Sequence, residues 1–120
     1  LKQGDMVWFG PDQDMGPKGS VFAPFFGRPA CTVTTPARLA RMSGAVSIFL
    51  DLHRDRDGIY HVRFVAMPSD YPSDDEVDNA QKLNSEIERV LRTHPTQYMW
   101  MHKRFKTNPD LTRQTLYQSD

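Results

Sequence analysis

Near the N-terminus, hydrophobic residues come in short runs separated by polar loops. Residues 6–9 are all apolar and are closed by Gly10 and Pro11, which predicts a buried strand that ends in a turn. A polar loop follows over residues 12–20. Residues 21–27 are again apolar and aromatic, but Pro24 cannot donate to a β-ladder. We therefore expect an edge strand or an irregular segment there, lining an apolar space.

The middle of the chain predicts a short helix and then a β-hairpin. Thr34 or Thr35 can cap the helix, Pro36 suits its first turn, and Gly44 is a typical stop. Gly58 can take the positive φ that the hairpin turn requires. The predicted elements are a helix from residue 36 to about 43, a strand over 45–52, a turn over 55–58 and a strand over 59–66.

A longer helix is predicted to begin near residue 73 and to end near His94, just before Pro95. Ser73 and Glu76 have the spacing of a capping box. Two pairs of opposite charge four residues apart support it, Asp78–Lys82 and Glu88–Arg92. One apolar stripe is expected to face the core, formed by Val77, Ala80, Leu83, Ile87, Val90 and Leu91.

These elements predict an α/β fold, a mixed sheet with flanking helices. The 120 residues suffice for one domain or part of one. We assign residues 1–109 to the domain and expect the polar residues 110–120 to be a disordered tail. No apolar run approaches the roughly 18 to 20 residues of a membrane-spanning helix.

Composition excludes several function classes. Fifteen Lys and Arg balance fifteen Asp and Glu, so no overall charge attracts the chain to nucleic acid or an anionic membrane. The only cysteine, Cys31, rules out an internal disulfide and a cysteine-built zinc site, and we expect it to be a buried structural thiol. No histidines have the spacing of metal ligands on a helix. We therefore expect no metal, no cofactor and no nucleic-acid partner.

The first candidate for chemistry is the run Asp12, Gln13 and Asp14, with Lys18 close in sequence. It follows a predicted strand, and ligands of open α/β sheets bind at the carboxyl ends of strands. Two carboxylates at this spacing can hold a hydroxyl or a cation. Equally, acidic residues in a loop rich in Gly and Pro serve as turn formers.

Two aromatic clusters are further candidates. Phe22, Phe25 and Phe26 can line a groove for an acyl chain, or they can pack in the core. Residues 100–106 combine Trp100 and a phenylalanine with cations, Arg104 among them. Such a patch suits phosphate groups or an anionic membrane interface, and single-stranded nucleic acid or an ordinary solvated face are the alternatives.

Three stretches in register resemble one family. They are residues 11–27 (PDQDMGPKGSVFAPFFG), residues 39–45 (LARMSGA) and residues 95–107 (PTQYMWMHKRFKT). Their order and spacing are similar to those of the lipid A biosynthesis acyltransferases of the lauroyl and myristoyl type, within the lysophospholipid acyltransferase superfamily. The resemblance implies the C-terminal portion of a glycerolipid-acyltransferase-like fold.

The resemblance also implies an activity. Such enzymes move an acyl group from acyl carrier protein to a hydroxyl of a lipid A precursor, at the cytoplasmic face of the bacterial inner membrane. A histidine of an H-x-x-x-x-D/E motif acts as general base. In this family Asp12 and Asp14 would hold the acceptor near that base, with Gln13, Lys18 and Arg104 as further substrate contacts. Phe22, Phe25, Phe26 and Trp100 would face the acyl groove or the membrane.

The catalytic histidine of that motif is missing from this sequence. Gly58, Ala66, Met99 and Thr107 stand five residues after its four histidines. We therefore expect a C-terminal fragment that is inactive by itself and poorly soluble or partly unfolded, with an unpaired sheet edge and uncovered apolar surface. Phe49 also stands where the family commonly has a proline. Two rival functions remain, a non-catalytic module that binds membranes or polyanions and an acyltransferase that acts on glycerophospholipid.

Overall fold

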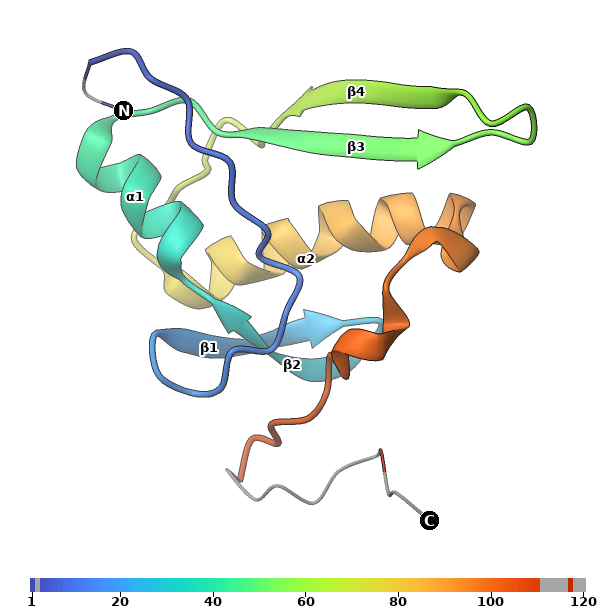
Figure 1. Cartoon of the computed structure of the whole chain (residues 1–120). Helices are drawn as coiled ribbons and strands as arrows, with labels where there is room; N and C mark the ends of the chain where they lie inside the picture. The colour runs from blue at the N-terminus through green and yellow to red at the C-terminus, as the bar shows by residue number, and fades with distance from the viewer. Residues whose placement is uncertain (2, 111–116, 118–120) are drawn as a thin grey trace.

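The computed structural model describes residues 1, 3–110 and 117, and it arranges two β-hairpins on either side of one long helix (Figure 1). The elements are β1 (Ser20–Phe25), β2 (Arg28–Val33), α1 (Thr35–Ser43), β3 (Ile48–Arg54), β4 (Tyr60–Ala66) and α2 (Glu76–Thr93), followed by 3-10 turns η1 (Pro95–Gln97) and η2 (Trp100–His102). The combination of helices and strands is as predicted. The single mixed sheet is wrong, because the described strands form two separate antiparallel pairs, β1–β2 and β3–β4.

The sequence pattern predicts only the first strand of the β1–β2 hairpin. Residues 21–27 were predicted to be an edge or irregular segment, and β1 is indeed an edge strand, since its sheet has two strands. Strand β2 was not predicted. The two-residue loop between them, Phe26 and Gly27, has φ values of 49° and 74°, as a type I′ turn requires. Pro24 and Pro29 face each other across the ladder, so the two residues that lack a backbone N–H stand opposite one another.

Helix α1 and the second hairpin confirm the predictions for the middle of the chain. Thr34 is the N-cap residue of α1, but its side chain makes no capping hydrogen bond and its hydroxyl donates to the Gly19 carbonyl instead. Gly44 closes the helix in the left-handed conformation, with its N–H donating to the carbonyl of Ala40. Strand β3 begins at Ile48 and ends at Arg54, a little later than predicted, and its turn contains Gly58 at φ 84°.

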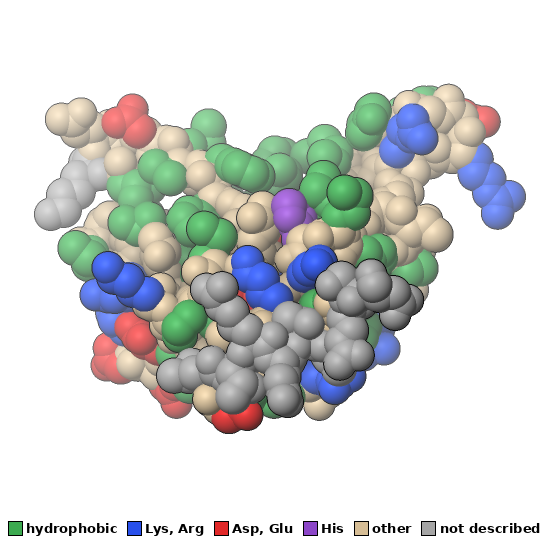
Figure 2. All heavy atoms as spheres, turned by 60° about the horizontal axis from the view of Figure 1, so that its bottom comes forward, with side chains coloured by type: hydrophobic (Ala, Val, Ile, Leu, Met, Phe, Trp, Pro, Cys, Tyr) green, Lys and Arg blue, Asp and Glu red, His purple; other side chains and the backbone are tan. Residues whose placement is uncertain are grey.

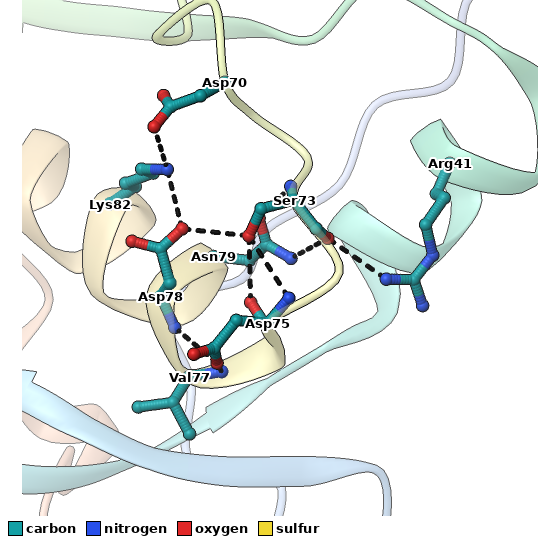
Figure 3. Close-up of polar contacts among 8 residues, drawn as sticks. All are labelled: Arg41, Asp70, Ser73, Asp75, Val77, Asp78, Asn79 and Lys82. Atoms are coloured by element: carbon teal, nitrogen blue, oxygen red, sulfur yellow. Dashed lines mark hydrogen bonds and ion pairs between the residues drawn. The ribbon is translucent and has the colours of Figure 1, made fainter.

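Helix α2 begins at a different cap from the one predicted. The carboxylate of Asp75 accepts hydrogen bonds from the backbone N–H groups of Val77 and Asp78, so Asp75 is the N-cap residue and the Ser73 capping box is wrong (Figure 3). Ser73 lies too early to reach these amides. Its hydroxyl instead donates to Asp78, and its backbone N–H donates to Asn79. The helix ends at Thr93, with His94 as C-cap, as expected.

The hydrophobic core lies between α2 and the β1–β2 hairpin. Its buried members are Phe25, Ala30, Leu83, Ile87 and Leu91, with Phe49, Tyr98 and Phe105 packed against them. Most of the predicted apolar stripe of α2 therefore faces inward, but Val77 is 45 % exposed. Both predicted ion pairs of the helix form, Asp78–Lys82 and Glu88–Arg92.

The apolar run over residues 6–9 is not a strand. The segment is irregular, and Met6 and Trp8 are 97 % and 78 % exposed. A strand needs a partner to complete its hydrogen-bond ladder, and none of the described strands pairs with this run. In Figure 1 the segment passes from the N-terminus beside α1 down to the β1–β2 hairpin. Within the described residues, no helix is long and apolar enough to cross a membrane. The predicted tail, residues 110–120, lies almost entirely outside the described residues.

Candidate functional site

The loop that carries the two aspartates is bound to the C-terminal segment. The Tyr98 hydroxyl donates to the backbone carbonyl of Asp12 over 3.0 Å. The side-chain nitrogens of Gln13 and His102 lie 3.5 Å apart. Thr107 binds Asp14. Residues 11–27 and 95–107, two of the three stretches that carry the family resemblance, thus form one structural unit.

The carboxylate of Asp14 is buried and accepts hydrogen bonds from other residues of the protein. It is 1 % exposed, and one oxygen accepts hydrogen bonds from the backbone N–H of Gly16 at 2.9 Å and from the Thr107 hydroxyl at 2.9 Å. The other oxygen accepts from the Thr107 N–H at 2.8 Å. The bond to Gly16 is an Asx-turn, the turn-forming alternative raised by the sequence. Contact between Asp14 and a substrate stays a prediction.

Arg104 lies in the interior and not on a surface patch. It is 2 % exposed, and its guanidinium donates to the Cys31 carbonyl at 2.6 Å, to the Thr32 hydroxyl at 2.8 Å and to the Asn84 side-chain oxygen at 3.1 Å. It also stacks over the Phe25 ring. Burial lowers the pKa of the Arg104 guanidinium. These contacts tie the C-terminal segment to β2 and α2, and a phosphate-binding role for Arg104 stays a prediction.

Cys31 has the environment of a structural thiol. It is fully buried, and its sulfur donates to the Gly16 carbonyl at 3.2 Å. Burial raises the pKa of the Cys31 thiol, which disfavours the reactive thiolate.

The remaining predicted polar contacts are closer to solvent. Gln13 and Lys18 are exposed, and Asp12 is half-buried. In the aromatic and basic segment, Lys103 and Lys106 are exposed, and Trp100 donates its indole N–H to the Pro95 carbonyl. Because Arg104 is buried, the continuous cationic patch that the sequence suggested is reduced to these two lysines. Figure 2 shows Lys and Arg side chains on this side of the molecule, below a hollow flanked by hydrophobic groups.

An apolar cavity of about 480 Å³ lies beside Asp12. Its walls come from the N-terminal segment, α1, β3 and α2. The hydrophobic lining includes Val7, Trp8, Phe9, Leu39, Val46, Ile48, Phe49, Leu50, Leu52, Leu83, Ile87, Val90, Leu91 and Tyr98. The size is within the range of ligand pockets.

The aromatic residues predicted to form an acyl groove do not line this cavity. Phe25 is completely buried in the core, Phe22 is half-buried, and Phe26 and Trp100 are partly exposed elsewhere. The apolar run at residues 6–9, which was predicted to be a strand, supplies part of the wall instead. The run has neither the period of a helix nor the alternation of a strand, and this is the sequence signal that favours an irregular segment.

Tyr98 connects the cavity to the aspartate loop, since it lines the cavity and binds Asp12. Burial, followed by the negative charge of Asp12, raises the pKa of Tyr98 to about 12. The phenol is therefore a neutral hydrogen-bond donor across the physiological pH range.

Three histidines stack on one another where the β3–β4 hairpin meets the C-terminal end of α2. The His53 ring lies between those of His61 and His94, with centroid separations of 5.1 and 4.1 Å. The ring planes are nearly parallel, with interplanar angles of 13° and 12°. In the part of the chain that the structure describes, no group of three or more His, Cys, Asp or Glu side chains could hold a metal ion.

Comparison with known proteins gives the class. Residues 1–107 match the family model described as bacterial lipid A biosynthesis acyltransferase. A lipid A biosynthesis lauroyltransferase of Escherichia coli is 41 % identical over 112 residues, which cover 92 % of this chain and 37 % of that enzyme. A palmitoleoyltransferase of the same pathway and organism is 41 % identical over 111 residues, 91 % of this chain and 36 % of the relative. A lipid A biosynthesis acyltransferase of Haemophilus influenzae is 36 % identical over 121 residues, 98 % of this chain and 39 % of the relative.

This chain therefore belongs to the bacterial lipid A biosynthesis acyltransferase family. It spans somewhat more than a third of the length of the relatives it matches.

Proposed function

We propose that this chain is part of an acyltransferase that moves a fatty acyl chain from acyl carrier protein to a hydroxyl of a lipid A precursor. The reaction would take place at the cytoplasmic face of the bacterial inner membrane. Family membership supports the reaction class, and the names of the relatives support the lipid A precursor as acceptor. The observation that carries the proposal in this chain is the apolar cavity beside Asp12.

The cavity suits the acyl chain of such a reaction, and Asp12 suits the acceptor hydroxyl. An acyl chain has no polar groups to satisfy, so an apolar cavity of this size can shield it from water. Asp12 lines the same cavity, and a carboxylate can accept a hydrogen bond from an acceptor hydroxyl. Tyr98 fixes the backbone of Asp12 through its hydrogen bond and thereby restricts the position of the carboxylate.

The general base would come from polypeptide outside these 120 residues. None of the four histidines precedes Asp or Glu at the spacing of the family motif. A histidine elsewhere would take the proton of the acceptor hydroxyl, the oxygen would attack the thioester carbonyl, and the thiolate of the carrier would leave. Asp12 would orient the acceptor for this attack.

A chimera provides the test. The matched 112 residues of the E. coli lauroyltransferase are replaced by this chain, and acyl transfer from lauroyl-acyl carrier protein to a lipid A precursor is measured. We expect an active chimera, an inactive isolated chain, and a loss of about 10²-fold in kcat/KM for Asp12→Asn, because misplaced reactants cost rate on this scale. Asp74→Asn, an exposed change at a residue that does not line the cavity, is the matched control.

Two results would contradict the proposal. A folded chimera without transferase activity would refute the assigned reaction. Transfer to a lysophospholipid acceptor in preference to the lipid A precursor would instead favour the glycerophospholipid alternative.

A further inference from the structure

The β3–β4 hairpin has two faces of opposite character. The face toward α2 carries Asp51 and His53, and these contact Arg89 at 3.6 Å and His94 at a ring separation of 4.1 Å. The opposite face has three apolar cross-strand pairs and ends, beside the turn, at the pair Arg54–Tyr60. We call the three apolar pairs the outer hairpin face, and they are Ile48–Ala66, Leu50–Phe64 and Leu52–Val62.

The outer hairpin face is exposed to solvent. Phe64 is 72 % exposed, Val62 53 % and Leu52 51 %. Directly paired side chains lie about 5 Å apart at Cβ, so these residues form one continuous patch. Antiparallel hairpins at a surface place polar residues outward and apolar residues inward. Here the outward face carries three apolar pairs, and such an exposed patch is typical of an interaction surface.

Figure 1 shows α2 on one side of the β3–β4 hairpin and, among the described residues, no helix or strand on the other. Each strand has seven residues, which corresponds to about 23 Å at roughly 3.3 Å per residue. A helix of about 15 residues has this length. The dimensions and the apolar character therefore fit the apolar stripe of one amphipathic helix.

We propose that the outer hairpin face docks an amphipathic helix from the part of a lipid A acyltransferase polypeptide that lies outside the matched region. The relatives supply the necessary length, because the match covers only 37 % of the E. coli lauroyltransferase. This inference rests on family membership and not on the acyl-transfer reaction.

The docked helix would also complete the apolar cavity. Ile48, Leu50 and Leu52 belong both to the outer hairpin face and to the cavity lining. Ligand pockets enclose most of their ligand's surface, whereas this cavity has strongly exposed walls at Trp8 and Val46. A helix on the hairpin would shield the β3 side of the cavity from water.

The hairpin's charges favour a polypeptide over a lipid surface. Membrane-binding faces combine apolar residues with an excess of cations. At the tip of this hairpin, Arg54 and Arg56 alternate with Asp55 and Asp57, so the tip carries no excess positive charge.

Thiol labelling tests the docking directly, since the native Cys31 is buried. Val62→Cys is introduced into the isolated chain and into the chimera, with any cysteine of the E. coli part replaced by serine. We expect maleimide labelling of Val62→Cys to be at least tenfold slower in the chimera. Met42→Cys, at an exposed position of α1 outside the outer hairpin face, is the control and should label at similar rates in both.

A charge substitution provides the second measurement. Phe64→Lys should lower the thermal unfolding midpoint of the chimera by several degrees, because the docked helix would bury the new charge. Met42→Lys, at the exposed control position, should leave the midpoint of the chimera unchanged.

Equal labelling of Val62→Cys in the two proteins would overturn the proposal, and so would an unchanged midpoint of the Phe64→Lys chimera. Concentration-dependent protection in the isolated chain would assign the face to a second copy, and protection only with phosphatidylglycerol and phosphatidylethanolamine vesicles would assign it to lipid. A protected but inactive chimera would contradict the proposed reaction alone. An active chimera with fast labelling would contradict the docking alone.

Discussion

Thr107 binds the carboxylate of Asp14 through both its backbone N–H and its hydroxyl, across 93 residues of sequence. The two residues lie in separate stretches of the family pattern. Their contact explains why a buried carboxylate is tolerated, since three donors satisfy it once Gly16 is included. Asp14 therefore holds the aspartate loop against the C-terminal segment, while Asp12 borders the cavity.

Asp14→Ala should loosen this contact. Removal of the carboxylate leaves the amides of Gly16 and Thr107 without their acceptor, at a cost of about 1–3 kcal/mol. We expect both amides to exchange hydrogen roughly 5- to 150-fold faster in the chimera, as measured by mass spectrometry or NMR. Asp12→Asn is the control, and equal acceleration by that change would show that Asp14 has no special role in the loop.

Arg104→Met should destabilise the protein more than it affects binding. Methionine keeps much of the volume but leaves the Cys31 carbonyl, the Thr32 hydroxyl and the Asn84 oxygen without their shared donor. We expect a loss of about 3 kcal/mol, seen as a lower thermal midpoint. The exposed Lys106→Met should be nearly neutral. If Arg104→Met weakens substrate binding while the midpoint stays constant, Arg104 is a substrate contact after all.

Sequence patterns such as helix caps, turn glycines and alternation predicted α1, α2 and the β3–β4 hairpin, because each of these patterns spans only a few residues. Gly44 and Gly58 mark a helix end and a turn, and the alternation in β4 reports its two faces. Strand β2 was missed since residues 28–33 contain Pro29 and lack alternation, so that their strand conformation depends on pairing with β1.

The candidate site was predictable only in part. The sequence indicated the aspartate loop and the C-terminal cations, yet the burial of Asp14 and Arg104 comes from partners 93 and 73 residues away. Composition cannot distinguish a buried guanidinium from an exposed one. The residues at 6–9 were misassigned for the same reason, because a strand is defined by a distant partner and not by its own apolarity.

Tyr98 should titrate at unusually high pH. The buried, hydrogen-bonded phenol holds its proton more tightly in the folded state, where its pKa is about 12, than in the unfolded chain, where it is about 10. Its contribution to stability is fully present below pH 10 and is lost as the pH rises from about 10 to 12. Absorbance at 295 nm should show this titration as the difference between the chimera and its Tyr98→Phe variant. A difference that titrates near pH 10 would place Tyr98 in water.

Asp51 offers a test at the acidic end of the pH range. Burial alone would raise its pKa, but the hydrogen bond and charge of Arg63, the charge of Arg89 and that of His53 together lower the pKa below its ordinary value. Arg63 donates to the carboxylate at 2.7 Å. The folded state thus favours the ionised form, and the resulting stability is present above the unfolded pKa of about 4 and disappears as the pH falls through the lower folded value.

Asp51→Asn should therefore destabilise the chimera at pH 7 by about 1–2 kcal/mol, a value kept small because both arginines are partly exposed. The difference from wild type should shrink as the pH approaches 3, where the wild-type carboxylate also loses its charge. Thermal midpoints of both proteins across pH 3–7 provide the measurement, with Asp57→Asn at the exposed hairpin turn as control. A difference that stays constant over this range would mean that the shape of the side chain, and not its charge, holds the hairpin to α2.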